Sequence, residues 1–261
     1  MQQGAAINLD LTGRVAIVTG ASRRGGIGAA ICRALASYGA GVLFTHWQAY
    51  DRKAGVGADE DGPMALEREL RALGVRAEGL AVDLAAPDAH LRVLDHAAER
   101  LGPPTILVNN AAYSTRDGYE RLDAATLDAH YAVNVRAMAL LSVEFARRYP
   151  GGPGGRIINL SSGQGVGPMP DELAYATTKG AVEAFTTSLA AGVAAKGITA
   201  NAVDPGATDT GWMTDEFKAQ LLAGMAFGRL GQPADAARLI VFLASDAGQW
   251  ITGQTIHSRG A

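Results

Sequence analysis

A tyrosine and a lysine four residues apart carry the most specific chemical signal in the sequence. Tyr175 and Lys179 stand in "YATTK", and Ser162 lies thirteen residues before the tyrosine. Residues i and i+4 of a helix share a face, so the Lys179 ammonium is expected near the Tyr175 phenol. A nearby positive charge favours the phenolate and lowers a tyrosine pKa toward the range of acid–base catalysis. A hydroxyl such as Ser162 can hold a carbonyl oxygen against the tyrosine, although an isolated Y-x-x-x-K is more often a solvated helix pair.

A glycine-rich turn supplies the second signal. The stretch "TGASRRGGIG" (19–28) follows an apolar run and precedes a helical pattern. Glycines there let the backbone approach a pyrophosphate, and a helix that begins near Ile27 offers it unpaired N–H groups. A tight strand–helix turn needs glycine in any case, so this turn alone leaves cofactor binding and a structural role open. Arg23 and Arg24 occupy the turn, which is one residue longer than the common T-G-x-x-x-G-x-G spacing.

Short apolar runs alternate with longer amphipathic segments along the chain. Strands are expected at 14–19, 40–45, 75–82, 105–110, 155–161, 198–203 and 255–257, and helices near 27–38, 63–73, 87–101, 123–149, 175–196 and 233–244. Continuous apolar strands are typical of a parallel sheet buried on both faces. We therefore expect an α/β fold, a single-domain Rossmann-like, doubly wound parallel seven-stranded sheet with helices on both faces over 1–261. Residues 49–62 are expected to form a polar excursion, and ligands should bind beyond the carboxyl ends of the strands.

Composition and charge limit the class of protein. The chain has 261 residues, of which 48% are hydrophobic and 19% charged, as in ordinary globular domains. A net charge of −3 makes a nucleic-acid partner improbable. No apolar run could span a bilayer and no signal pattern opens the chain, so we expect a cytoplasmic protein with no membrane partner and no metal site. The single cysteine, Cys32, is expected in the core of the first helix.

Together these motifs resemble the short-chain dehydrogenases/reductases. The resemblance runs from Arg14 to Gly260 and is carried by "TGAS…GIG", "VDL", "LVNNAA", "AVNVRA", "IINLSS", "YATTKGA", "ITANAVDPGATDT" and "ITGQTIH". Within that family the pattern looks most like the 3-oxoacyl-acyl-carrier-protein reductase branch. The resemblance implies a dinucleotide-binding part over about 10–160 and a catalytic and substrate part over about 160–261.

The resemblance implies a catalytic tetrad of Asn134, Ser162, Tyr175 and Lys179. Tyr175 would give its proton to a ketone oxygen while the reduced nicotinamide delivers hydride to the carbon. Ser162 would orient that oxygen, and Lys179 would lower the tyrosine pKa and bond the nicotinamide ribose. Asn134 would interrupt a long helix and hold the water of a proton relay.

The resemblance also implies where a dinucleotide binds. Asp83 would bond the adenine amino group, and Arg23 and Arg24 would meet the 2′-phosphate of NADP(H). The second strand ends in "FTHW" without a carboxylate, which favours NADP(H) while leaving NAD(H) open. The expected cofactor residues are Gly20, Ser22, Arg23, Arg24, Gly26, Ile27, Gly28, His46, Asp83, Leu84, Asn110, Ala111, Ala112, Tyr175, Lys179, Pro205, Gly206, Thr208 and Thr210.

Three functions remain open at this point. The first is an NADPH-dependent carbonyl reductase that converts a ketone to a secondary alcohol, with a 3-oxoacyl thioester as one substrate class. An acyl-carrier protein is then a candidate partner, although Lys196 matches only one of two basic docking positions and the other falls at Pro153. The second is an NAD(P)-dependent alcohol dehydrogenase of another small or polyketide-like substrate. The third is a non-catalytic dinucleotide-binding regulator, which an intact tetrad disfavours.

Small side chains along 175–196 predict self-association. Ala181, Ala184, Ser188, Ala191 and Ala195 recur at three- and four-residue steps, which lets a second helix approach closely. Alanine is also simply a good helix former on an exposed face. The family resemblance implies a homotetramer, with a homodimer as the alternative.

Overall fold

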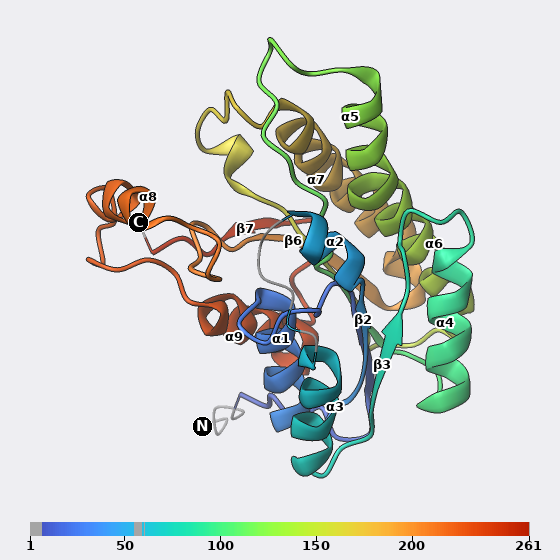
Figure 1. Ribbon diagram of the computed structural model, residues 1–261. Helices are drawn as coiled ribbons and strands as arrows, with labels where there is room; N and C mark the ends of the chain where they lie inside the picture. The colour runs from blue at the N-terminus through green and yellow to red at the C-terminus, as the bar shows by residue number, and fades with distance from the viewer. Residues whose placement is uncertain (1–6, 55–58, 60, 261) are drawn as a thin grey trace, which may run out of the picture.

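A parallel sheet of seven strands forms the centre of the computed structural model, which describes residues 7–54, 59 and 61–260 (Figure 1). The strands are β1 (Val15–Val18), β2 (Gly41–His46), β3 (Ala77–Ala81), β4 (Ile106–Asn109), β5 (Gly155–Leu160), β6 (Ile198–Asp204) and β7 (Thr255–His257). Their order across the sheet is β3-β2-β1-β4-β5-β6-β7, and every neighbouring pair is parallel. The order reverses between β1 and β4, where a crevice opens at the carboxyl ends of the strands. The expected doubly wound sheet is confirmed.

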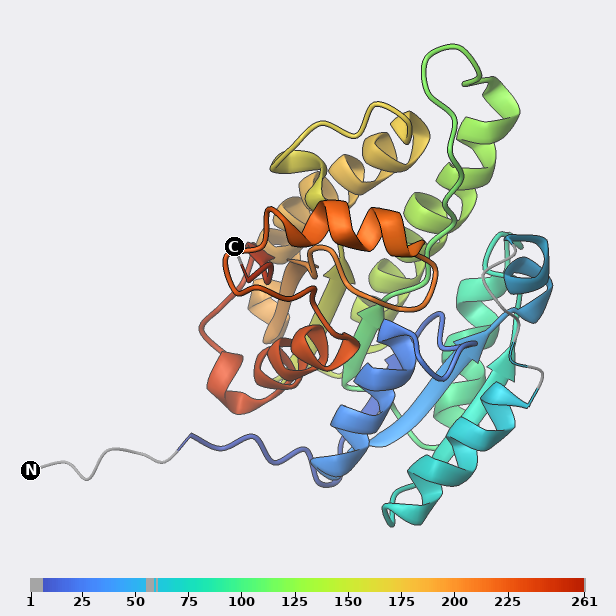
Figure 2. The ribbon, with the colours of Figure 1, turned by 60° about the vertical axis from the view of Figure 1, so that its left-hand side comes forward.

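Helices cover both faces of this sheet (Figures 1 and 2). One face carries α1 (Ile27–Ser37), α3 (Gly62–Ala72) and α9 (Pro233–Ala244), and the other carries α4 (Ala89–Arg100), α6 (Met138–Arg148) and α7 (Leu173–Val193). Successive β1 side chains point to opposite faces, so Ile17 and Val18 enter different core clusters. Cys32 is a core residue of α1, and burial raises the pKa of its thiol. Among the described residues, no helix is long and apolar enough to cross a bilayer.

Two helical features differ from the sequence-based expectation, and a third is an interruption that the family resemblance implied. The polar excursion begins with a helix, α2 (Gln48–Ala54), and part of the rest, residues 55–58 and 60, lies outside the described residues. A further helix, α8 (Asp215–Leu222), follows β6. The helix expected over 123–149 is divided into α5 (Ala124–His130), a π-helical segment η1 (Tyr131–Ala137), and α6. Short 3-10 turns complete the order at η2 (Gly163–Gly165), η3 (Ala194–Lys196) and η4 (Asp246–Gly248).

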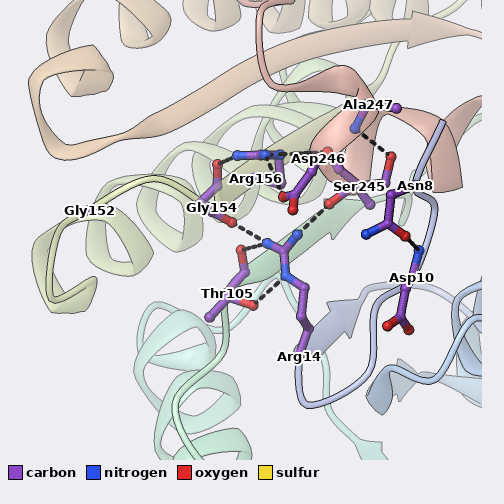
Figure 3. Close-up of polar contacts among 12 residues, drawn as sticks. Asn8, Asp10, Arg14, Thr105, Gly152, Gly154, Arg156, Ser245, Asp246 and Ala247 are labelled. Atoms are coloured by element: carbon purple, nitrogen blue, oxygen red, sulfur yellow. Dashed lines mark hydrogen bonds and ion pairs between the residues drawn. The ribbon is translucent and has the colours of Figure 1, made fainter. Parts of the chain in front are cut away.

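A partly buried arginine fastens the edge of the sheet opposite the crevice (Figure 3). Arg14, directly before β1, donates hydrogen bonds to the carbonyl oxygens of Ala244 (2.6 Å) and Gly154 and to the hydroxyl of Thr105 (3.2 Å). Burial lowers the pKa of Arg14 to about 10, and the neighbouring Arg156 is 2% exposed. These contacts supply the hydrogen bonds that a buried guanidinium requires.

Candidate active site

Three polar side chains of the predicted tetrad meet where β5 ends and α7 begins. The Lys179 ammonium lies 5.4 Å from the centre of the Tyr175 ring, as the helical spacing predicts. The Ser162 hydroxyl hydrogen-bonds the Tyr175 phenol. Lys179 itself donates to the carbonyl oxygen of Leu160 at 2.7 Å. The arrangement places a hydroxyl, a phenol and an ammonium together at the carboxyl edge of the sheet.

Burial sets the protonation states of this group. It raises the pKa of Tyr175 to about 12, while the hydrogen bond with Ser162 acts in the opposite direction. It also lowers the pKa of Lys179 to about 8. The expected lowering of the tyrosine pKa is therefore wrong for the chain's own side chains, because burial outweighs the other contributions and Lys179 is turned to a backbone carbonyl. The phenol is held protonated at neutral pH, as a proton donor must be.

Asn134 lies in the π-helical segment that interrupts the long helix. Its side-chain amide donates to the carbonyl oxygen of Tyr113 (2.9 Å) and the hydroxyl of Thr178 (3.0 Å), and accepts from the Tyr113 N–H (2.7 Å). Thr178 in turn donates to the carbonyl oxygen of Tyr175. Asn134 thus ties the segment after β4 to α7 one turn from Tyr175, and π-helical turns are frequent at functional sites.

The glycine-rich turn is shaped by close backbone packing. Gly20 has a φ of +74°, and a Cβ there would lie 2.6 Å from the Cα of Ala111. A Cβ on Gly28 would overlap the carbonyl oxygen of Gly20. The Asn110 amide also donates to that carbonyl at 2.9 Å. Because α1 begins directly behind the turn, its unpaired N–H groups fit a pyrophosphate, while the missing side chains of Gly20 and Gly28 let the turn pack closely against Ala111 and against itself.

The remaining predicted cofactor residues lie along the same edge. Each group follows the carboxyl end of a strand: His46 ends β2, Asp83 and Leu84 follow β3, Asn110 to Ala112 follow β4, and Pro205 to Thr210 follow β6. The Asp83 carboxylate accepts from the Ala85 N–H at 2.9 Å. Thr208 donates to the carbonyl oxygen of Pro205 at 3.2 Å. The sheet topology thus brings the predicted residues into one continuous line.

Comparison with known proteins identifies this arrangement. A family model described as enoyl-(acyl carrier protein) reductase matches residues 20–260. The chain belongs to the short-chain dehydrogenase/reductase family. It is an NAD(P)-dependent oxidoreductase of that family.

Two curated relatives and one solved structure illustrate the similarity. The uncharacterized oxidoreductase YjdA of Bacillus subtilis (strain 168) is 50% identical over 249 residues, which cover 95% of this chain and 96% of that protein. The 3-oxoacyl-[acyl-carrier-protein] reductase FabG of Pseudomonas aeruginosa is 34% identical over 255 residues, covering 97% and 98%. A blue fluorescent protein from a metagenomic library, solved in complex with NADPH, has a TM-score of 0.86 at 33% identity and covers 96% of this chain and 98% of its own.

The two arginines of this short-chain dehydrogenase/reductase point in different directions. Arg23 stays at the cofactor edge, where its Nη1 donates to the carbonyl oxygen of Thr210 at 3.1 Å and its Nε lies 4.0 Å from the Asp51 carboxylate. Arg24 instead forms an ion pair with Glu69 on α3, and its side chain is 52% exposed. The sequence treated the two residues alike, but the structure leaves only Arg23 beside the Asp51 carboxylate and the Thr210 segment.

Helix α2 adds two side chains that sequence reasoning missed. No carboxylate ends β2, yet α2 brings the Asp51 carboxylate to Ser22 and Arg23, and burial raises its pKa. Helix α2 also carries Tyr50, whose hydroxyl accepts a hydrogen bond from the N–H of Ser114 at 3.1 Å. Tyr50 thus joins α2 to the loop after β4. Only recognising a helix within 49–62 could have revealed either residue.

Asp117 is a further residue that the sequence did not reveal. Its carboxylate is 4% exposed and accepts from the N–H groups of Leu173 (2.7 Å) and Ala174 (3.0 Å) at the start of α7. A carboxylate at a helix N-terminus stabilises the first turn. Asp117 therefore fixes the end of α7 that carries Tyr175, from a position more than fifty residues earlier in the chain.

Proposed function

We propose that this oxidoreductase is an NADPH-dependent carbonyl reductase that converts a ketone to a secondary alcohol. The supporting observation is the partly buried phenol of Tyr175, which stays protonated at neutral pH and lies within hydrogen-bonding reach of the Ser162 hydroxyl. A reduction consumes a proton at the carbonyl oxygen. A tyrosine with a pKa of about 12 is protonated at neutral pH and can supply it.

The reduced nicotinamide supplies the hydride when it is bound. Ser162 and Tyr175 hold the carbonyl oxygen between two O–H groups, and the Tyr175 O–H bond breaks as its proton passes to that oxygen. Lys179 stabilises the phenolate left behind, because its ammonium lies over the same ring, 5.4 Å from its centre. Asn134 acts in this scheme by fixing α7 through Thr178.

We further propose NADP(H) as the preferred cofactor. Arg23 is positioned to form charge-assisted bonds with a 2′-phosphate. The NADPH complex of the metagenomic relative supports the same choice. His46 adds no positive charge there, because burial lowers the pKa of its imidazole. Asp51, 4.0 Å from Arg23, opposes part of the arginine's charge and limits the preference.

The FabG relative supports a 3-oxoacyl compound as one substrate class. Docking of an acyl-carrier protein gains no support from Lys196, because its ammonium donates to the carbonyl oxygens of Ala146 (2.5 Å) and Arg147 (3.3 Å). A basic residue bound within its own chain is less suited to an acidic partner. We therefore keep the carrier-free ketone as the proposed substrate form.

The small residues of α7 support a proposal of self-association. Ala184, Ser188, Ala191 and Ala195 are all exposed in the single chain. Their short side chains would let the same helix of a second chain approach closely. We propose a homotetramer in which α6 and α7 form one contact, with a homodimer through that contact as the alternative.

The decisive experiment is the substitution Tyr175→Phe. The variant keeps the ring but lacks the proton donor, so NADPH binding should persist while turnover falls by about a hundredfold or more. NADPH oxidation with a panel of ketones measures turnover, and quenching of protein fluorescence measures binding. Tyr119→Phe is the matched control, because Tyr119 is 84% exposed. Full activity of the Tyr175 variant would refute the proposed function.

A further inference from the structure

An arginine close to the C-terminus lies beside the proposed carbonyl-binding serine. Nη2 of Arg259 stands 2.6 Å from the place that a Cβ of Gly163 would take, and Gly163 directly follows Ser162. The Cα, Cβ and Cγ atoms of Arg259 similarly lie 3.0–3.2 Å from the Cβ position of Gly206. Gly206 has a φ of +67° and follows the carboxyl end of β6, on the same edge of the sheet as Ser162. The absence of a side chain at Gly163 and at Gly206 therefore leaves the space that the Arg259 side chain occupies.

The guanidinium is held along one side only. Its Nε lies 3.3 Å from the carboxylate of Asp204, which is 1% exposed and also contacts Nδ1 of His257 at 2.9 Å. In the part of the chain that the structure describes, neither terminal nitrogen of Arg259 donates a hydrogen bond to another residue. The Arg259 side chain is 28% exposed, so it is partly buried and still accessible to solvent. An arginine fixed at Nε presents Nη1 and Nη2 as a rigid pair of donors.

We propose that Arg259 binds a carboxylate carried by the ketone substrate, an inference that rests on the proposed reductase function. A carboxylate matches the two parallel N–H donors of a guanidinium. Because Gly163 is the immediate neighbour of Ser162, the carboxylate would lie only a few bonds from the carbonyl group. Asp204 anchors the arginine and Ser162 holds the carbonyl oxygen, so the substrate is fixed at two points. The substrate class is thus a short keto acid.

A purely structural ion pair is the competing explanation. In that case Arg259 serves only to neutralise the buried charge of Asp204, and its loss would weaken the enzyme toward every ketone alike. Carboxylate recognition instead predicts an effect that depends on the charge of the substrate. The ratio of kcat/KM for an acid to that for its methyl ester separates the two explanations, because fold defects cancel in it.

The test uses the full-length protein with NADPH and two matched pairs of ketones. Acetoacetate is compared with methyl acetoacetate, and levulinate with methyl levulinate. The wild type should prefer the acid of at least one pair, and Arg259→Gln should lower that acid/ester ratio by about 10- to 100-fold. The acid/ester ratio of Arg259→Lys should fall between those of the wild type and Arg259→Gln. Lysine keeps the positive charge but lacks the paired N–H donors of the guanidinium. Gly163→Ala should lower the ratio independently, because its Cβ displaces Nη2.

Arg92→Gln is the control, since Arg92 is an exposed residue of α4. Thermal unfolding and NADPH binding of each variant verify that the site is intact. Turnover of acids and esters with a ratio that Arg259→Gln leaves unchanged would overturn this inference alone. Absence of NADPH oxidation with every ketone would overturn the proposed function and this inference with it.

Discussion

We predict that Lys179, although it belongs to the proposed catalytic site, lowers the free energy of unfolding of the protein. Its ammonium is buried against one carbonyl oxygen, and burial lowers its pKa from 10.5 to about 8. This lowering of the pKa corresponds to about 3 kcal/mol of destabilisation at pH 7. Lys179→Met removes that penalty and loses one hydrogen bond worth about 1 kcal/mol. At pH 7 the variant should therefore be about 2 kcal/mol more stable than the wild type, although inactive as a reductase.

The pH dependence gives this prediction its sign. Between pH 8 and 10.5 the unfolded chain holds the Lys179 proton and the folded chain has released it. The stability contributed by this residue therefore rises with pH through that window, and below pH 8 the penalty is present in full. The advantage of Lys179→Met should stay constant from pH 7 to about 8 and then shrink as the pH is raised to 9.5.

Urea unfolding followed by tryptophan fluorescence measures the effect, with the protein concentration held constant because association shifts apparent stability. Lys196→Met is the control, because Lys196 also bonds a carbonyl oxygen but lies nearer to the solvent. A Lys179→Met variant that is less stable than the wild type at pH 7 would refute the reasoning. So would an advantage that does not change with pH.

Four further substitutions test the cofactor site and the assembly. Arg23→Ala should raise the KM for NADPH about tenfold and leave the KM for NADH unchanged. Arg24→Ala should change neither KM much, because Arg24 pairs with Glu69. Equal effects of the two substitutions on the KM for NADPH would contradict the assignment of Arg23 to the 2′-phosphate. Gly28→Ala should weaken both cofactors in a binding titration, since its Cβ overlaps the turn. Ala184→Arg should lower the mass measured by light scattering and reduce activity; a wild-type chain of 27.0 kDa that is fully active as a monomer would exclude the proposed contact.

Local sequence signals predicted the scaffold well. Apolar runs located all seven strands, and the Tyr175–Lys179 spacing placed both side chains on one face of α7. Both results follow from periodicity, which is a property of neighbouring residues. The π-helical turn at Asn134 also lies where the family resemblance placed an interruption.

Contacts between distant segments could not be read in the same way. Asp117 caps a helix more than fifty residues later, and Asp51 reaches the glycine-rich turn from a helix that the polar composition concealed. Arg24 meets Glu69 only because α3 packs beside α1. The pKa of Tyr175 was predicted in the wrong direction, because a sequence displays nearby charges but not the depth of burial.

The arginine that fastens the rear of the sheet also bears on the order in which the chain folds. Arg14 is joined to residue 105 across 91 positions, to residue 154 across 140 and to residue 244 across 230. During synthesis the Arg14 guanidinium therefore cannot bond the Ala244 carbonyl oxygen until nearly the whole polypeptide has left the ribosome. Strand β1 can pair earlier, but the partly buried guanidinium of Arg14 gains its last hydrogen bond only when α9 arrives. Completion of the native state is thus deferred to the C-terminal segment, and a chain arrested before that helix lacks one of the partners of this cation.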